Sequence, residues 1–169
     1  MSFLSRYAQL GEEFDPQSIT VKPALRANTL RTKEWEIIND LKAKGVALTR
    51  IPNIPHGYWY EAGFSLGATP AFLQGRYYLQ EAASQLPPLL LDPQPGETIL
   101  DMAAAPGSKT TQLAQLIDNQ GVIVALDTEV PRLKSLQHNL ERMGVTCAAT
   151  YKKDARYVAD LGLQFDRIL

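Results

Sequence analysis

Residues 98–110 read Thr-Ile-Leu-Asp-Met-Ala-Ala-Ala-Pro-Gly-Ser-Lys-Thr, and this stretch decides the fold of the second half of the chain. An apolar run ends at Asp101, a turn of small residues follows, and apolar residues recur at helical spacing from Lys109 onward. The pattern predicts a strand, a tight loop and a helix start. Small side chains let a ligand approach the loop backbone, and the helix N-terminus offers free N–H groups. Open α/β sheets hold nucleoside cofactors in this way, at the carboxyl ends of their strands.

Two common nucleotide-binding loops fit this stretch poorly. A P-loop requires glycine, four residues and then Gly-Lys-Ser/Thr. Here Ser108 separates Gly107 from Lys109, and Met102 stands where the first glycine should be. A dinucleotide loop requires three glycines, and Gly107 is the only glycine in this loop.

The loop resembles motif I of the Sun/Nop-type S-adenosylmethionine-dependent RNA (cytosine-5) methyltransferases, which reads Asp-x-(Cys/Ala)-Ala-Ala-Pro-Gly-(Gly/Ser)-Lys-Thr. The match is nearly complete from Asp101 to Thr110. The alternative is a plain strand-to-helix turn, but a turn alone does not require Pro-Gly-Ser-Lys-Thr in that order. The resemblance implies S-adenosylmethionine as cofactor and RNA as partner. It assigns cofactor contacts in this loop to Ala103, Ala104, Ala105, Pro106, Gly107, Ser108 and Lys109.

Length and composition describe one ordinary domain, or a small domain plus part of another. The chain has 169 residues, of which 45% are hydrophobic and 21% charged. Its net charge of −1 gives no global electrostatic footprint for nucleic acid, so RNA contact requires a local basic surface. A single cysteine fits a reducing compartment. There is neither a signal-peptide pattern nor a membrane-length apolar run, so we expect a cytoplasmic protein without a membrane partner.

The Pro- and Gly-rich stretch 92–96 separates two regions of the chain that have different sequence patterns. After it, the pattern alternates between strands and helices. Strands are expected at 97–102, 122–126, 146–151 and from 165, and helices at 108–118 and 130–143, with a helical turn at 155–161. This alternation predicts a parallel sheet with right-handed crossovers. The expected class is α/β, with the first half of a Rossmann-like methyltransferase sheet that stops in its fourth strand.

The residues before this region predict a small α/β domain over 1–75, with a possible RNA contact, followed by the S-adenosylmethionine-binding domain over 76–169. Its expected elements are a helix at 3–10, a strand at 23–30, a helix at 33–44 with Thr32 as its N-cap, and a strand at 46–51. Residues 75–79 lead into a helix over 80–91. Pro87 and Pro88 are expected to break or kink that helix.

Two carboxylates follow strands of the predicted sheet. Asp127 ends the second strand, where an acidic side chain can accept both ribose hydroxyls of a nucleoside; the alternative is an exposed N-cap for the next helix. Asp154, in an Asp-Ala-Arg run, resembles the family's aspartate that reaches the adenine amine, and a capping role for the turn at 155–161 is compatible with this. Arg132 resembles the segment after the ribose aspartate. It is interpreted as pinning the loop or the cofactor, with a solvated helix residue as the alternative.

The run Arg26-Ala-Asn-Thr-Leu-Arg31 resembles a family segment that precedes the cofactor domain. The resemblance implies RNA contact by Arg26, Asn28 and Arg31, because arginines pair with phosphates and Asn offers both donors and acceptors. The alternative is an ordinary strand with an exposed polar face. The family's substrates are transfer and ribosomal RNA, and the compact leading unit favours transfer RNA.

The family's nucleophile is missing from this chain. Methylation of cytosine C5 requires a cysteine thiolate that adds at C6, and the family carries its cysteines in Pro-Cys and Thr-Cys loops after the fourth and fifth strands. Cys147 matches neither loop and is interpreted as a small core residue. We therefore assign no catalytic or metal-binding residue and expect the chain alone to be inactive. The alternatives are a non-catalytic cofactor- or RNA-binding module, or one half of a split enzyme completed by a second chain.

Overall fold

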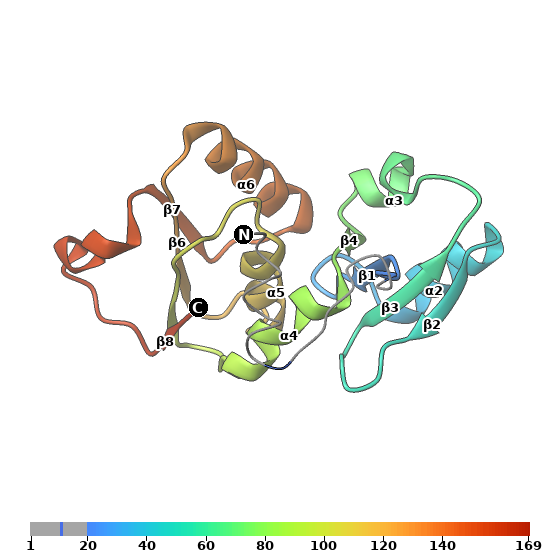
Figure 1. The fold of residues 1–169 in the computed structure, drawn as a ribbon, viewed down its shortest axis with the longest axis horizontal. Helices are drawn as coiled ribbons and strands as arrows, with labels where there is room; N and C mark the ends of the chain where they lie inside the picture. The colour runs from blue at the N-terminus through green and yellow to red at the C-terminus, as the bar shows by residue number, and fades with distance from the viewer. Residues whose placement is uncertain (1–10, 12–19) are drawn as a thin grey trace.

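The computed structural model describes residue 11 and residues 20–169, so the helix expected at 3–10 lies outside the described residues. The strands form two four-stranded sheets, which lie beside each other along the long axis of the molecule (Figure 1). The strand order is β2-β3-β1-β4 in the first sheet and β7-β6-β5-β8 in the second. Within the described residues, no helix is long and apolar enough to cross a membrane.

The first sheet is entirely antiparallel. Its strands are β1 (Ala24–Ala27), β2 (Ala47–Arg50), β3 (Gly57–Glu61) and β4 (Tyr77–Leu79). One face packs on α2 (Glu34–Ala43), whose Ile37 and Leu41 are buried against Leu25 and Tyr77. The short helices η2 (Leu66–Ala68) and α3 (Pro70–Leu73) connect β3 to β4.

Three details of this half differ from the sequence-based expectation. Strand β4 forms where a lead into a helix was expected, and Leu79 pairs with Leu25 of β1. The first sheet therefore continues past the expected domain boundary at 75 and 76. No element was expected for β3. The N-cap of α2 is Lys33, without a side-chain bond, rather than the expected Thr32, whose hydroxyl donates to Glu36 Oε2 at 2.8 Å.

The second sheet is parallel, as the sequence predicted. Its strands are β5 (Thr98–Asp101), β6 (Val122–Asp127), β7 (Ala148–Lys152) and β8 (Arg167–Ile168). Both α5 (Ser108–Leu116) and α6 (Val130–Met143) pack on the face that carries Ile123 and Ala125. The 3-10 helix η3 (Ala155–Leu161) packs against the opposite face, which carries Leu100, Val124 and Leu126.

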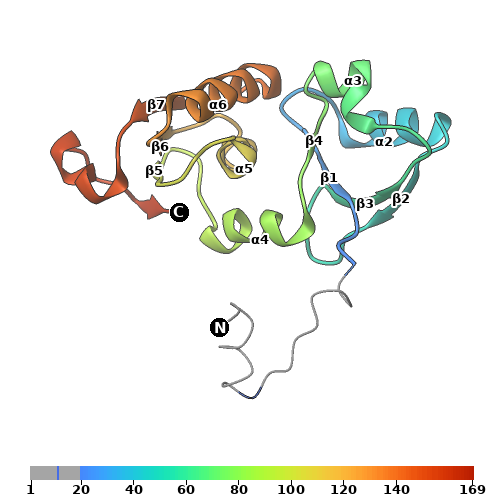
Figure 2. The same ribbon diagram turned by 45° about the horizontal axis from the view of Figure 1, so that its top comes forward.

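Helix α4 (Ala82–Leu91) joins the two sheets, as Figure 2 shows. It contains Pro87 and Pro88 yet continues to Leu91, so the expected break does not occur. Proline has no N–H to donate to the carbonyl four residues earlier. For Pro88 that carbonyl belongs to Ser84, and the side chain of Gln80 donates to it instead, from Nε2 at 3.0 Å. The side chain thus replaces the missing backbone donor.

Candidate functional site

The loop between β5 and α5 is fixed at its start by Asp101, which is 3% exposed. The carboxylate accepts hydrogen bonds from Thr110 Oγ1 at 2.7 Å and from the backbone N–H of Ala103 at 3.3 Å. Burial raises the pKa of Asp101, because desolvation penalises the charged form. The backbone N–H of Ala104 donates to the carbonyl of Leu126 in β6 at 2.9 Å. The loop is therefore tied to its own helix and to the neighbouring strand.

Gly107 brings the end of this loop close to α6. Its φ is +106°, and an added Cβ would lie 3.0 Å from Leu136 Cδ1. Its N–H donates to the carbonyl of Ala104 at 2.7 Å, and Ala104 and Ala105 are buried beside Leu136. Gly107 occupies the N-cap position of α5, so the first N–H groups of this helix have no partner within the helix.

The remaining loop residues are open to solvent to different extents. Ala103 and Pro106 are exposed, whereas Ser108 and Lys109 are half-buried. The peptide bond before Pro106 is cis. The positive charge of Lys109 acts on the nearby Asp101 carboxylate and partly offsets the effect of burial on its pKa. This part of the loop thus presents small side chains, backbone N–H groups and one ammonium group.

Asp127 ends β6 and is 4% exposed. Its Oδ1 accepts from the N–H of Glu129 at 3.1 Å, and its Oδ2 lies 3.4 Å from Arg132 Nη1. Because Glu129 is the N-cap of α6 and Asp127 is buried, the alternative of an exposed capping aspartate is wrong. The Arg132 Nη2 also donates to the carbonyl of Ala105 at 2.7 Å. Arg132 therefore links the end of β6 to the motif loop.

Asp154 follows β7 and is the N-cap of η3. Its Oδ1 accepts from the backbone N–H of Arg156 at 2.9 Å, and its Oδ2 pairs with Arg156 Nη2 at 2.7 Å. Hydrogen bonds from the Arg156 side chain and backbone lower the pKa of Asp154 to about 2. The N–H of Lys153 donates to the carbonyl of Asp127 at 3.1 Å, so the ends of β6 and β7 lie together.

The side chains of the three residues predicted to contact RNA make hydrogen bonds to other parts of the protein. Arg26 and Asn28 are each 1% exposed. Arg26 hydrogen bonds to residues of α5, and Asn28 Nδ2 donates to the carbonyls of Gly75 and Met143, each at 2.8 Å. Arg31 is exposed, but its guanidinium donates to carbonyls at the end of α6. Arg26 and Asn28 are therefore not on a surface that RNA could reach in this structure.

Cys147 lies immediately before β7, at the amino edge of the sheet. Its carbonyl accepts from the N–H of Ile123 at 2.8 Å. Asp127 and Asp154 lie at the opposite, carboxyl edge. Burial raises the pKa of the Cys147 thiol, which lowers its thiolate fraction at neutral pH.

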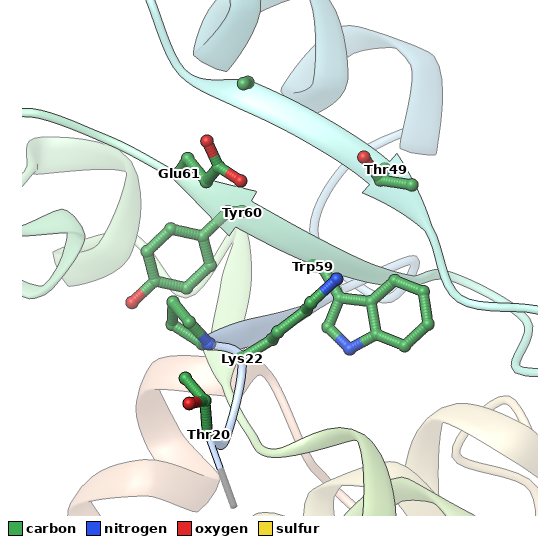
Figure 3. A pocket seen from close by; sticks show the side chains of 8 residues that line it. Thr20, Lys22, Thr49, Trp59, Tyr60 and Glu61 are labelled. Carbon is green, nitrogen blue, oxygen red and sulfur yellow. The ribbon is translucent and has the colours of Figure 1, made fainter. Parts of the chain in front are cut away.

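A groove of about 400 Å³ lies beside the first sheet, and Figure 3 shows the side chains that line it. Its lining includes Lys22, Thr49, Trp59 and Glu61, and the Lys22 ammonium lies 5.5 Å from the centroid of the Trp59 ring. None of the predicted cofactor residues lines this groove.

Sequence reasoning missed the buried polar side of α5. Thr111 and Gln112 are at most 2% exposed, and Gln115 hydrogen bonds across to the first sheet. Polar residues in a helix normally face solvent, so the periodicity of α5 contained no signal for this contact.

Two family models match the chain, one for each half. Residues 2–82 match the family model of the N-terminal domain of 16S rRNA methyltransferase RsmF, and residues 88–169 match that of 16S rRNA methyltransferase RsmB/F. The chain is 44% identical over 156 residues to ribosomal RNA small subunit methyltransferase F of Shewanella woodyi, covering 88% of this chain and 33% of that protein. It is 40% identical over 169 residues to the human 28S rRNA (cytosine(4447)-C(5))-methyltransferase, covering 96% of this chain and 20% of that protein.

A solved structure has the same fold. The methyltransferase homologue from Pyrococcus horikoshii superposes with a TM-score of 0.84 at 40% identity, covering 89% of this chain and 50% of that one. The chain thus spans about a third of the length of the bacterial relative and a fifth of the human one. With both family models matched in order along the sequence, the chain belongs to the Sun/Nop-type family of S-adenosylmethionine-dependent RNA (cytosine-5) methyltransferases.

Proposed function

We propose that this chain binds S-adenosylmethionine at the carboxyl ends of β5, β6 and β7, as part of an enzyme that methylates C5 of cytosine in RNA. One observation carries the proposal. Arg132 bridges Asp127 and the carbonyl of Ala105, so a buried carboxylate and the small-residue loop form one continuous site. Open α/β sheets bind nucleosides at this edge.

The chemistry of the donor set fits each part of the cofactor. The free N–H groups at the start of α5, together with Lys109, suit the methionyl carboxylate. The Asp127 carboxylate suits the ribose hydroxyls, and Asp154 suits the adenine amine. Gly107 lets the loop pack against α6, because a side chain there would press on Leu136, and the exposed Ala103 leaves the neighbouring loop backbone accessible to a ligand. When bound, S-adenosylmethionine supplies a methyl group made electrophilic by its sulfonium.

In this proposal the residues of the chain hold and orient the cofactor and do not act as the nucleophile. Addition at cytosine C6 requires a thiolate. Cys147, the single cysteine in the sequence, lies at the opposite edge of the sheet with a raised pKa. We therefore expect the nucleophile to come from residues outside this sequence, in the same longer protein or in a second chain.

For the domains, we propose that residues 76–169 bind the cofactor and that residues 1–75 contribute to RNA contact, with the first sheet extending to Leu79. For the substrate, we propose ribosomal RNA. The relatives are named for rRNA, which outweighs the preference for transfer RNA drawn from the compact leading unit. A cytoplasmic location stays part of the proposal.

Calorimetry with S-adenosylmethionine tests the cofactor site. Asp127→Asn should weaken binding by about 1–3 kcal/mol, because charge-assisted hydrogen bonds to the ribose become neutral ones. Asp118→Asn is the matched control, since Asp118 is exposed at the end of α5, away from the carboxyl edge. Equal affinity of the Asp127 and Asp118 variants would refute the ribose assignment. An unaltered chain that does not bind the cofactor would refute the site as a whole.

A further inference from the structure

The side chain of Arg26 reaches from the first sheet to the helix that follows the motif loop. Arg26 lies on β1, and its Nε donates to Gln115 Oε1 at 3.1 Å. Its Nη1 donates to the carbonyl of Ser108 at 2.9 Å, and its Nη2 donates to Thr111 Oγ1 at 2.9 Å. Its remaining partner is Gln80 Oε1, at 2.5 Å from Nη1. Three of the four acceptors therefore belong to α5.

These contacts concentrate on the first turn of α5. Ser108 is the first residue of the helix and directly follows Gly107. The Thr111 hydroxyl accepts from Arg26 and donates to the Ser108 carbonyl at 3.1 Å. The guanidinium thus holds the turn whose N–H groups face the proposed cofactor site.

The acceptors are themselves fixed by further hydrogen bonds. Gln80 Nε2 donates to Gln112 Oε1 at 2.9 Å, and Gln115 Nε2 donates to the carbonyl of Ala27 at 3.1 Å. A buried network of this kind is stable in one geometry, because any shift leaves polar groups unpaired. Directional hydrogen bonds, in addition to packing, therefore fix the position of α5 relative to β1.

A charged group is a costly choice for a purely structural contact here. A cation near a helix N-terminus opposes the helix dipole, and burial lowers the pKa of Arg26 by desolvating it. Apolar side chains could join two packed surfaces at a lower cost. A positive charge at the start of α5 does, however, favour an anionic ligand at the same place.

We propose that Arg26 is a positioning residue for S-adenosylmethionine: it holds the first turn of α5 where the backbone N–H groups meet the methionyl carboxylate. The first sheet is then a required part of the cofactor site although none of its residues touches the cofactor. This inference rests on the proposed function and adds to it a role for the first sheet.

The proposal predicts a selective loss of affinity. Arg26 contacts α5 and not the ends of β6 and β7, where the ribose and adenine would bind. Arg26→Met should therefore weaken S-adenosylmethionine binding about tenfold. Binding of 5′-methylthioadenosine, which lacks the amino-acid part, should stay within about twofold. A merely structural role would weaken the binding of both ligands alike.

Arg31→Met is the matched control. Arg31 also connects the N-terminal half to the second sheet, but it donates to the carbonyls of Glu141 and Arg142 at the far end of α6. Its loss should leave the affinity for both ligands unchanged. A selective loss with Arg31→Met equal to that with Arg26→Met would contradict the assignment to Arg26.

Calorimetry with both ligands, on chains whose native fold is verified by circular dichroism, distinguishes the outcomes. If the unaltered chain binds neither ligand, the proposed function fails. If it binds both, and Arg26→Met changes neither or weakens both equally, the proposed function stands and the role of Arg26 is overturned. Should Arg26→Met not fold, Thr111→Val takes its place, because it removes one acceptor on α5 and keeps the side-chain shape. Its expected result is the same selectivity with a smaller loss.

Discussion

Substitution of Gly75 by alanine should damage the contact between the two sheets. Gly75 has a φ of +70°, and an added Cβ would lie 1.8 Å from the carbonyl oxygen of Arg142 at the end of α6. That end must then move by about 1.5 Å to restore a normal contact. Asn28 donates to the carbonyls of Gly75 and Met143 at 2.8 Å each, so the shift would also break buried hydrogen bonds.

The cost can be estimated from these parts. The left-handed backbone costs a non-glycine residue about 1 kcal/mol, and each buried polar group left unpaired costs about 1–3 kcal/mol. With both hydrogen bonds of Asn28 lost, Gly75→Ala should therefore lower the free energy of unfolding by about 3–7 kcal/mol, a large part of the stability of an ordinary domain.

Gly45→Ala is the matched control. Its φ is +81°, and an added Cβ would have no neighbour within 4 Å. The free energy of unfolding of Gly45→Ala should fall only by the cost of the left-handed backbone, about 1 kcal/mol. Urea unfolding followed by circular dichroism measures both variants under one set of conditions. Losses for Gly75→Ala and Gly45→Ala that agree within about 0.5 kcal/mol would refute the reasoning, because the clash with α6 would then carry no energy.

Two further results are expected. Because burial raises the pKa of Asp101, its carboxyl holds a proton to higher pH in the folded chain than in the unfolded one. Its contribution to stability therefore falls as pH rises from its ordinary value near 3.8 through the raised pKa. The melting temperature of the unaltered chain should fall over this pH range, and that of Asp101→Asn should not. Melting temperatures that change in parallel with pH in the two proteins would contradict the prediction. Gln80→Met should leave the Ser84 carbonyl of α4 without a donor and speed amide exchange in the second half of that helix. The exposed Gln94→Met serves as its control, and equal exchange in both would reject the explanation for the unbroken helix.

The second sheet could be predicted because its elements can be recognised from short, continuous stretches of sequence. Strands β5 and β6 are short apolar runs, helices α5 and α6 have apolar residues at helical spacing, and helix 130–143 was predicted with its observed bounds. The edge where Asp127 and Asp154 lie follows from parallel strands alone. Their cofactor contacts stay predictions.

The first sheet could be predicted only in part, because its pairing is not local. Strands β3 and β4 are short, and they owe their conformation to hydrogen bonds with β1, whose paired residues lie 31 to 54 positions earlier in the chain. Arg26 was misplaced for the same reason. An arginine on a strand looks like a surface residue until its acceptors are known, and Ser108 is 82 residues away.

The amide-rich contact between α5 and the first sheet has a mechanical consequence. Apolar surfaces tolerate sliding, whereas hydrogen bonds weaken steeply when they are misaligned. Because Gln80, Gln112 and Gln115 hold this contact by directed bonds, the two sheets should turn as one rigid body. A hinge between them would have to break several buried bonds at once. Any motion that admits or releases a ligand is then left to the exposed loop residues Met102, Ala103 and Pro106, and to the segment at 162–166, whose Phe165 packs on the opposite face of the sheet.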